Sequence, residues 1–519
     1  MCSVTTNIGM LSSPALDKPL LLSSRMPGHT LLNRDDYWKG DVATALAIAT
    51  LCLEFAYAFP AVVLRIILVG VLTLRAQATT LPALLVCQLY ASDFKLSGLL
   101  TYEYLLDRHE AARITIFGFP ITTNYIFALC LTLNILTRIL SRPQVLRGMM
   151  PQSTVILWCT CFPIAVVAAL ANLTGSAVSW TAPIRDSMMV GCVFFGFIIG
   201  EDANAIRRVI INRLLPMFFC MITLALFGYF YARGMYWITA AGPSILATKV
   251  MMRDRSVSWR FALSFAVLTT AYAYAFYPTA YASQVAKALY SDNATTFALK
   301  GMWCGALVLV PIAILLRPRY FDRKSAFATG KPKLELSFAA WGAGLLMLSF
   351  PVMLAAISYQ VQVELSSKRY SVELPWQEQL LFKLLYDRAP IYRGAIDEVM
   401  QPPYLFKAGR RESYRLTLNG DKIPWPAGSH NLVLEQLRRN GWYCGLVSLT
   451  IMIGGMMWAC TGFLKTKDSF LTWYAGATFI TLFISGITSH IPMETNASIW
   501  LLTPAGIAAA LYRHEVVNS

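Results

Sequence analysis

The sequence predicts an all-α polytopic membrane protein of about 12 to 14 transmembrane helices, with one long outer loop that contains short helices. The first observation is composition: 56% of the residues are hydrophobic and 14% are charged, whereas soluble domains carry about 25% charged residues. The second is that apolar runs of about 17 to 25 residues, the length that crosses a bilayer, recur from Ala43 to Leu511. The third is that short polar stretches, many of them basic, separate these runs.

The chain divides into four expected parts. Residues 1–41 are polar and lack the features of a cleaved signal peptide, so they are predicted to form a cytoplasmic N-terminal tail. Residues 42–358 form a transmembrane helix bundle, in which basic stretches such as "AIRRVIINR" mark cytoplasmic loops. Residues 359–441 form the long outer loop, because long translocated segments do not follow the charge rule. Residues 442–519 form C-terminal transmembrane helices and a short cytoplasmic tail.

The net charge and the cysteine and histidine content indicate which partners, thiol states and cofactors to expect. The net charge of +16 favours anionic membrane lipids and a phosphorylated substrate. No aromatic and basic module stands outside the apolar runs, so nucleic acid is not an expected partner. The 11 cysteines fall almost wholly in apolar runs, and we expect buried free thiols. The five histidines are scattered and no glycine-rich phosphate loop is present, so no metal and no nucleotide cofactor is predicted.

The first half of the long outer segment has helical periodicity. In "PWQEQLLFKLLYDRAPIYRGAIDEVM" apolar residues recur at helical spacing from Trp376, and Pro390 should divide the stretch into two helices. An amphipathic helix with Trp on its apolar side would lie along the membrane surface and hold Asp387, Arg388 and Arg393 at head-group depth. A helix face packed against the ends of the spans explains the same spacing equally well.

The sequence of the second half of the long outer segment predicts a loop followed by a short helix. "YRLTLNGDKI" has the Asn-Gly turn of a β-hairpin. In "SHNLVLEQLRRNG", Ser429 is the expected N-cap, and Asn440-Gly441 the expected left-handed C-cap. His430 would then lie at the positive end of a helix, which favours a neutral imidazole that can accept a proton. A structural role in the cap is the alternative interpretation of His430.

Three stretches together resemble a known family. "SHNLVLEQLRRNGWYCGLVSL" is similar to the small-His-Asn, apolar, Gly-x-x-x-Gly signature of the O-antigen ligase and O-antigen polymerase superfamily. "DRAPIYRGAIDEVMQPPYLFKAG" resembles that family's upstream stretch with arginine, aromatic residues and proline. "SGITSHIPMETNASIWLL" resembles its closing segment. The detailed resemblance covers about a quarter of the chain. These proteins are bacterial integral-membrane glycosyltransferases that use undecaprenyl-diphosphate-linked glycans.

The resemblance implies two catalytic residues, Arg388 and His430, which correspond to the family's loop arginine and loop histidine. A guanidinium can hold diphosphate oxygens with two parallel hydrogen bonds. A neutral His430 could take the proton of the acceptor hydroxyl as it attacks the anomeric carbon. The resemblance also implies inversion at that carbon, with no metal and no other cofactor.

Further substrate contacts are expected around these two residues. Arg393 and Asn431 lie beside them in the sequence and are predicted to bind the diphosphate or an acceptor phosphate. Arg185 in "WTAPIRDSMMVG" is the candidate for the family's arginine at the outer end of an earlier span, and Arg233 in "YARGMYW" is its rival. The family often has an acidic residue near the last outer loop, where this chain has His490 and Glu494.

The expected function is that of a glycosyltransferase of the bacterial inner membrane, with its site facing the periplasm. Its donor would be an undecaprenyl-diphosphate-linked glycan, and its acceptor lipid A core, as in the O-antigen ligation step of lipopolysaccharide synthesis. A polymerase that extends a lipid-linked glycan is an alternative.

A polysaccharide or lipid transporter is another alternative, because Glu54 and Arg65 lie in adjacent apolar runs and intramembrane charges often mark transport paths. A structural pair across a tight helical hairpin explains these two residues as well. A membrane scaffold protein is a further alternative. Its basic outer loop would bind a partner, and it would not need His430.

Overall fold

The computed structural model describes residues 34–90, 114–116, 119–121, 123–141, 191–226, 236–252, 255–275, 349–356, 388–405, 407, 413–417, 419–425, 428–488 and 495–518. Most of these residues are helical. The helices are α1 (Arg34–Ala56), α2 (Ala58–Arg75), α3 (Leu81–Cys87), α5 (Thr123–Ser141), α9 (Gly191–Gly200), α10 (Ala203–Val209), α11 (Leu215–Leu226), α12 (Tyr236–Met252), α13 (Trp259–Ala275), α19 (Ala389–Val399), α20 (Leu432–Lys465), α21 (Ser469–Thr488) and α22 (Thr495–Asn518). A 3-10 turn, Ala78–Thr80, precedes α3, and a π-helical turn, Ile210–Leu214, joins α10 to α11.

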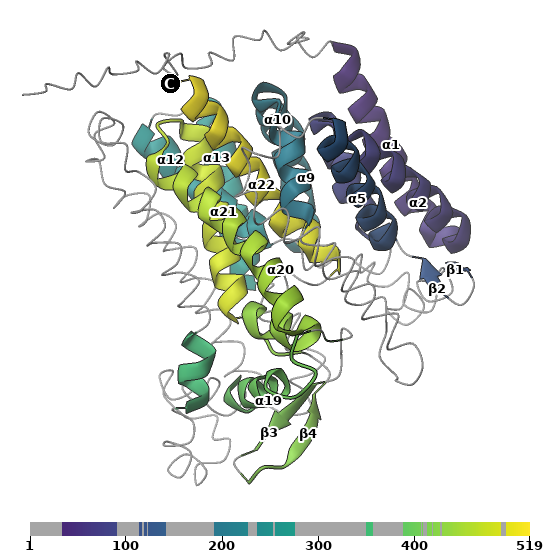
Figure 1. The fold of residues 1–519 in the computed structure, drawn as a ribbon. Helices are drawn as coiled ribbons and strands as arrows, with labels where there is room; N and C mark the ends of the chain where they lie inside the picture. Colours follow the sequence, from purple (N-terminus) through teal and green to yellow (C-terminus); the bar gives the residue numbers. More distant parts are fainter. Residues whose placement is uncertain are drawn as a thin grey trace, which may run out of the picture.

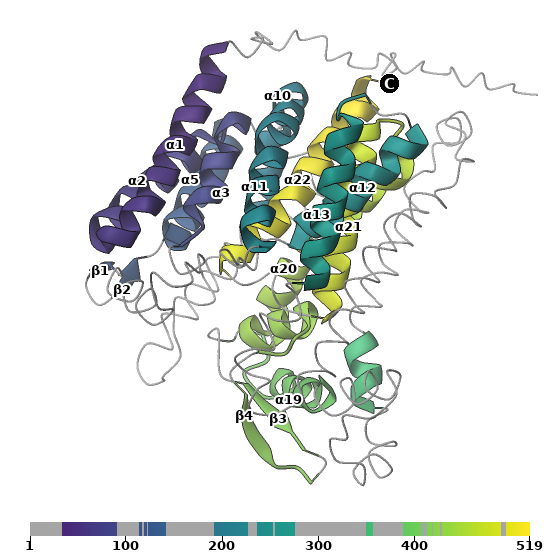
Figure 2. The ribbon, with the colours of Figure 1, turned by 180° about the vertical axis from the view of Figure 1, so that it is seen from behind.

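The strands form two antiparallel hairpins. They are β1 (Ile114–Ile116) with β2 (Phe119–Ile121), and β3 (Ser413–Leu416) with β4 (Lys422–Trp425). Most of the helices lie side by side, while α19 and the β3–β4 hairpin project beyond one end of them (Figure 1). The view from behind shows the same separation (Figure 2). We call α19, β3, β4 and residues 428–440 the hairpin module.

Among the described residues, three helical stretches are long and apolar enough to cross a membrane: Ala58–Arg75, Ala203–Leu226 and Ser469–Ile487. A bent pair, Leu432–Leu446 with Ser448–Lys465, raises this number to four if it is one span. These apolar helices suggest a membrane protein, in agreement with the coarse prediction. The predicted count of 12 to 14 spans stays a prediction, because it includes many apolar runs outside the described residues.

The α1–α2 hairpin contains the two charges that could have marked a transport path. Arg65 forms a buried ion pair with Glu54, and the two side chains are 0% and 1% exposed. Arg65 Nη2 also lies 3.5 Å from the Thr50 carbonyl oxygen. The pair that the structural interpretation predicts is therefore present. Helix α1 begins at Arg34, inside the segment predicted to be a polar tail.

The cysteine prediction is correct in one respect and wrong in another. The seven described cysteines are free thiols, as expected. However, Cys52 on α1 and Cys220 on α11 are exposed rather than buried. The sides of α1 and α2 also expose large apolar residues such as Ile48, Leu64 and Ile67. Outward-facing apolar surface of this kind is what a helix in contact with lipid presents, so an apolar sequence position need not be a buried one.

Helix α19 is packed inside the protein. Pro390 lies in its first turn, as the sequence predicted for a helix start at this position. Ala389, Tyr392 and Ala395 share a buried apolar cluster with Leu434 of α20 and with residues 354 and 355. The apolar side of this half of the stretch therefore contacts protein, as in the packed alternative, and the prediction that it contacts lipid is wrong. Its expected first half, Trp376–Asp387, lies outside the described residues.

The β3–β4 hairpin confirms the prediction made from the Asn-Gly turn. Leu416 is opposite Lys422, and Gly420 adopts a φ of 88° in the connection between the strands. The hairpin approaches α19 closely at Gly394. A Cβ atom added to Gly394 would lie 1.9 Å from the carbonyl oxygen of Tyr414, which is rigid backbone. Only glycine allows this contact.

The variant Gly394→Ala is expected to push the hairpin away from α19, at a cost of about 1 to 3 kcal/mol typical of overpacking. Hydrogen exchange of the amides in β3 and β4 measures this directly, and we expect faster exchange there. Gly70→Ala in α2 is the control, because its added Cβ would make ordinary contacts of 3.5 Å and longer. Unchanged protection of the hairpin in Gly394→Ala would contradict the close packing.

Candidate functional site

The start of α20 is shaped by His430 and Asn431. His430 is a buried residue with a positive φ of 53°, a conformation that few non-glycine residues adopt and in which histidine is enriched. The resulting turn lets Asn431 Oδ1 accept from the amides of Val433 (3.0 Å) and Leu434 (3.1 Å). Asn431 is therefore the N-cap, and the prediction of Ser429 in this role is wrong. Ser429 Oγ instead donates to the Asn431 carbonyl oxygen at 3.0 Å.

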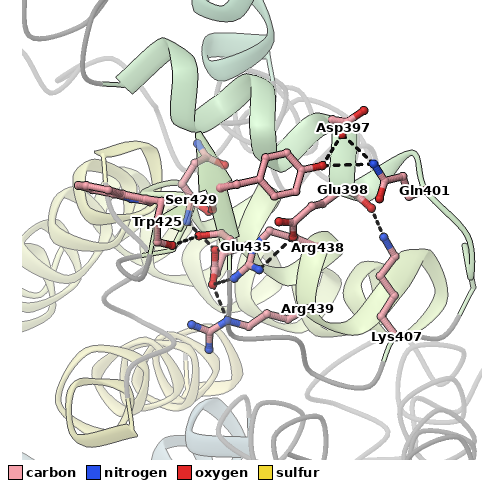
Figure 3. Close-up of polar contacts among 12 residues, drawn as sticks. Asp397, Glu398, Gln401, Lys407, Trp425, Ser429, Glu435, Arg438 and Arg439 are labelled. Carbon is pink, nitrogen blue, oxygen red and sulfur yellow. Dashed lines mark hydrogen bonds and ion pairs between the residues drawn. The ribbon is translucent and has the colours of Figure 1, made fainter. Parts of the chain in front are cut away.

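A buried charge network holds the loop that carries His430 (Figure 3). The Glu435 carboxylate accepts from the Ser429 amide, immediately before His430, at 2.7 Å. Arg438 Nη2 donates to the same carboxylate at 2.7 Å, and Arg438 Nη1 donates to Glu398 of α19 at 3.1 Å. The Arg438 side chain is fully buried, as is that of Glu435. The network thus joins α19 to the beginning of α20 through satisfied charges.

The helix bends where this network ends. Gly441 has a non-helical conformation (φ 79°, ψ 177°), which falls at the predicted C-cap of the short helix. The stretches Leu432–Leu446 and Ser448–Lys465 lie at 83° to each other. The amides of Trp442 and Tyr443, released by the break, donate to the carbonyl oxygens of Tyr404 (2.8 Å) and Leu405 (3.1 Å).

Arg388 lies at the beginning of α19 and is half-buried. Its Nη1 atom is buried and has no hydrogen-bond partner in the part of the chain that the structure describes. Ala389, the next residue, shares an apolar cluster with Leu434 near the start of α20, whereas Glu398 near the end of α19 contacts Arg438 further along α20. The order of these contacts indicates that Arg388 and His430 lie at the same side of the hairpin module.

The other predicted substrate-binding residues have different positions. Arg393 is buried, and its Nε donates to the Leu416 carbonyl oxygen at 3.1 Å, so it supports the β3–β4 hairpin. Asn431 is fully buried, and besides capping α20 its Nδ2 donates to the Ile487 carbonyl oxygen of α21 at 3.3 Å. Arg185, Arg233, His490 and Glu494 lie outside the described residues, and their predicted roles stay predictions.

Trp425 at the end of β4 lies beside His430. The two rings have centroids 6.1 Å apart. Arg415 of β3 lies over the Trp425 ring, with its guanidinium carbon 3.6 Å from the ring centroid. Trp425 Nε1 is buried and has no hydrogen-bond partner among the described residues. A buried N–H without a partner is unfavourable, and a bound hydroxyl oxygen would satisfy it.

A second polar cluster, on the exposed side of the module, was not predicted from the sequence. Asp397 accepts hydrogen bonds from Tyr414 and from Gln401 (2.7 Å) and forms an ion pair with Lys422 at 3.1 Å. Burial raises the pKa of Asp397, but the hydrogen bonds from Tyr414, Lys422 and Gln401 outweigh it, so that this pKa lies below its ordinary value of 3.8. Burial and the bond to Asp397 raise the pKa of Tyr414 above its ordinary value of 10.0.

These shifts predict a pH range for the stability of the hairpin. The lowered pKa of Asp397 gives stability that is present above pH 3.8 and is lost as pH falls through the lower value in the folded protein. The raised pKa of Tyr414 gives stability that is present below pH 10.0 and is lost as pH rises through the higher value. Hydrogen exchange of the β3 and β4 amides, corrected for intrinsic rates, should show both losses. Asp397→Asn should abolish the acidic one, and an unchanged acidic loss would contradict this assignment.

The described fold and site define a mostly helical protein with helices long and apolar enough to cross a membrane, and with a small polar module at one end. Among the described residues, no group of three or more His, Cys, Asp or Glu side chains is placed to hold a metal ion. The chain matches no family model, no curated protein and no solved structure. The function therefore has to be argued from the site.

Proposed function

We propose that this chain is a metal-independent membrane glycosyltransferase that moves a glycan from undecaprenyl diphosphate to an acceptor hydroxyl. O-antigen ligation to lipid A core is the reaction we favour, and extension of a lipid-linked glycan is the alternative. The bacterial inner membrane is the proposed location, with the hairpin module on the periplasmic side. The observation that carries the proposal is His430, buried at the start of α20 in a left-handed conformation and held by the Glu435–Arg438 network.

The backbone of His430 is costly to form, which supports a functional role. A non-glycine residue with positive φ costs of order 1 to 3 kcal/mol and persists only when its surroundings impose it. Here Asn431 on one side and the bond from Ser429 to Glu435 on the other impose it. A general base needs this kind of fixed position, because it must lie within hydrogen-bond reach of the proton that it removes. In the proposed reaction, that proton belongs to the acceptor hydroxyl.

Arg388 supplies the charge that the donor requires. Departure of the lipid diphosphate from the sugar develops negative charge on the leaving oxygen, and guanidinium hydrogen bonds stabilise such oxygens. The buried Arg388 Nη1 has no hydrogen-bond partner in the described chain and is available to a phosphate oxygen. We assign Arg393 and Asn431 to supporting the module rather than to the diphosphate, since their described contacts are with backbone groups.

The buried ion pair between Glu54 and Arg65 disfavours the transporter alternative. Each of the two charges has the other as its partner within the α1–α2 hairpin. A transport path would require at least one of them to contact the cargo or a coupling ion, and breaking a buried pair is strongly unfavourable.

The experiment is a transfer assay with purified protein in lipid nanodiscs. An undecaprenyl-diphosphate-linked glycan is supplied with lipid A core or with a second lipid-linked repeat, and products are followed on a gel. Product on lipid A core supports the ligase, and growth of the lipid-linked chain identifies the polymerase. No product with either acceptor, from folded protein and a donor that a known enzyme of this kind uses, would refute the proposal.

Arg388→Met is expected to lower the transfer rate about 10-fold to 100-fold, because it removes a charge-assisted hydrogen bond worth roughly 1.5 to 3 kcal/mol. Initial rates at several donor concentrations measure the effect. Arg208→Met is the matched control, since Arg208 is exposed on α10 at the end of the bundle away from the hairpin module (Figures 1 and 2). Equal rates for the two variants would remove Arg388 from the site.

A further inference from the structure

Five exposed apolar side chains come together where the hairpin module meets the helical bundle. They belong to the segment after α19 and to α20 beyond its bend: Met400 (61% exposed), Tyr404 (52%), Leu405 (59%), Trp442 (36%) and Leu446 (49%). We call these five residues the apolar rim. Two backbone hydrogen bonds fix the two parts together, from Trp442 to Tyr404 and from Tyr443 to Leu405. Tyr404 and Leu405 therefore lie beside the turn of α20 that carries Trp442.

The rim continues along the outward face of an apolar helix. Trp442, Leu446 and Thr450 are exposed at intervals of four residues, which places them on one side of α20. Thr450 Oγ1 donates to the Leu446 carbonyl oxygen at 2.8 Å, as expected for one helical turn. The opposite side of the same helix is buried, with Cys444 3% and Ser448 2% exposed. Ser448–Lys465 is the second stretch of the bent pair, which is long and apolar enough to cross a membrane when its two stretches are taken together.

This continuity identifies what covers the rim. The exposed face of a membrane-crossing helix contacts lipid, and the rim sits at the end of that face. Tyr and Trp side chains are enriched at this depth, since their rings are apolar and their polar atoms can reach the head groups. We propose that the apolar rim inserts among the acyl chains of the leaflet on the side of the hairpin module.

Insertion has a consequence for the whole module. Residues 404 and 405 are bonded to the first turn after Gly441, and Glu398 of α19 is bonded to Arg438 just before it. Anchoring the rim therefore holds α19 and the start of α20 at the membrane surface. The surface anchor predicted for the amphipathic stretch around α19 is instead provided by the residues that follow α19. This proposal does not depend on the proposed enzymatic activity.

The test uses a photo-reactive residue, p-benzoylphenylalanine, placed at Tyr404 and, separately, at Leu405. The full-length protein is purified in nanodiscs of phosphatidylethanolamine and phosphatidylglycerol, irradiated and measured by mass spectrometry. Ile423 on β4 is the matched control, because it is apolar and 50% exposed but lies in the hairpin. At all three positions the photo-reactive residue replaces an exposed side chain. Correct folding is therefore expected, and it is checked by gel filtration.

We expect a mass increase of one phospholipid at positions 404 and 405 and none at 423. Lipid adducts of equal yield at all three positions, or none at 404 and 405, would overturn the proposal. Crosslinks between two copies of the chain at 404 or 405 would overturn it in favour of self-association. Adducts that form only after addition of undecaprenyl phosphate would overturn it in favour of a site for one specific lipid.

Discussion

His430→Asn is expected to lower the rate of glycan transfer by about 100-fold to 10,000-fold, the range that loss of a general base produces. Asparagine is chosen because it tolerates the left-handed conformation that His430 adopts with a φ of 53°. It has a similar polar character but no nitrogen that can accept the proton of a hydroxyl. The fold should therefore remain while the chemistry is lost. Initial rates with saturating donor and acceptor measure the effect.

The control for this variant is His514→Asn. His514 lies near the end of α22, where its Nε2 contacts the Glu201 carbonyl oxygen at the opposite end of the bundle from the hairpin module. The same replacement there should leave the transfer rate unchanged. A His430→Asn protein that transfers glycan at the rate of the wild type would show that His430 has only a structural role.

Arg438→Met is expected to destabilise the protein by about 3 to 5 kcal/mol, because it removes the buried cation that Glu398 and Glu435 share, although Glu435 keeps its pair with Arg439. Arg438 is fully buried between Glu435 and Glu398, whose side chains are 0% and 4% exposed. The loss should appear as a lower unfolding temperature in detergent and as faster hydrogen exchange in α19 and at the start of α20. Transfer should fall as well, since Glu435 holds the backbone beside His430.

Two further variants test whether the effect of Arg438→Met comes from charge that is left buried. Arg213→Met removes an exposed pair with Asp41, in which the side chains are 45% and 48% exposed, and should cost only about 0 to 1 kcal/mol. Adding Glu398→Gln to Arg438→Met removes the carboxylate charge that loses its ion pair with Arg438, and it should recover part of the lost stability. A destabilisation by Arg438→Met no larger than that of Arg213→Met would mean that the network contributes little.

Local features of the hairpin module could be predicted from the sequence. The Asn-Gly turn predicted the β3–β4 hairpin, Pro390 predicted the helix start that became α19, and Gly441 predicted the end of the short helix. Each depends on backbone preferences of one or two residues, which act over a few positions in the chain.

Features that depend on distant residues could not be predicted. The pair between Glu398 and Arg438 joins residues 40 positions apart, and periodicity could not say whether α19 faces lipid or α20. Ser429 and Asn431 are both of residue types that cap helices, and the φ of His430 makes Asn431 the N-cap. The role of Asp397 followed from the approach of Gly394 to Tyr414, a contact between separate elements.

The most direct measurement of the proposed function is the fate of the lipid carrier in nanodiscs that contain purified protein, a labelled donor and lipid A core. Free undecaprenyl diphosphate and glycan-bearing acceptor are counted in the same sample. Glycosyl transfer predicts one molecule of free carrier for each glycan transferred, with both signals lost when the acceptor is omitted. Intact donor that remains uncleaved in the presence of acceptor, with protein shown to be folded, would contradict an enzyme of this kind.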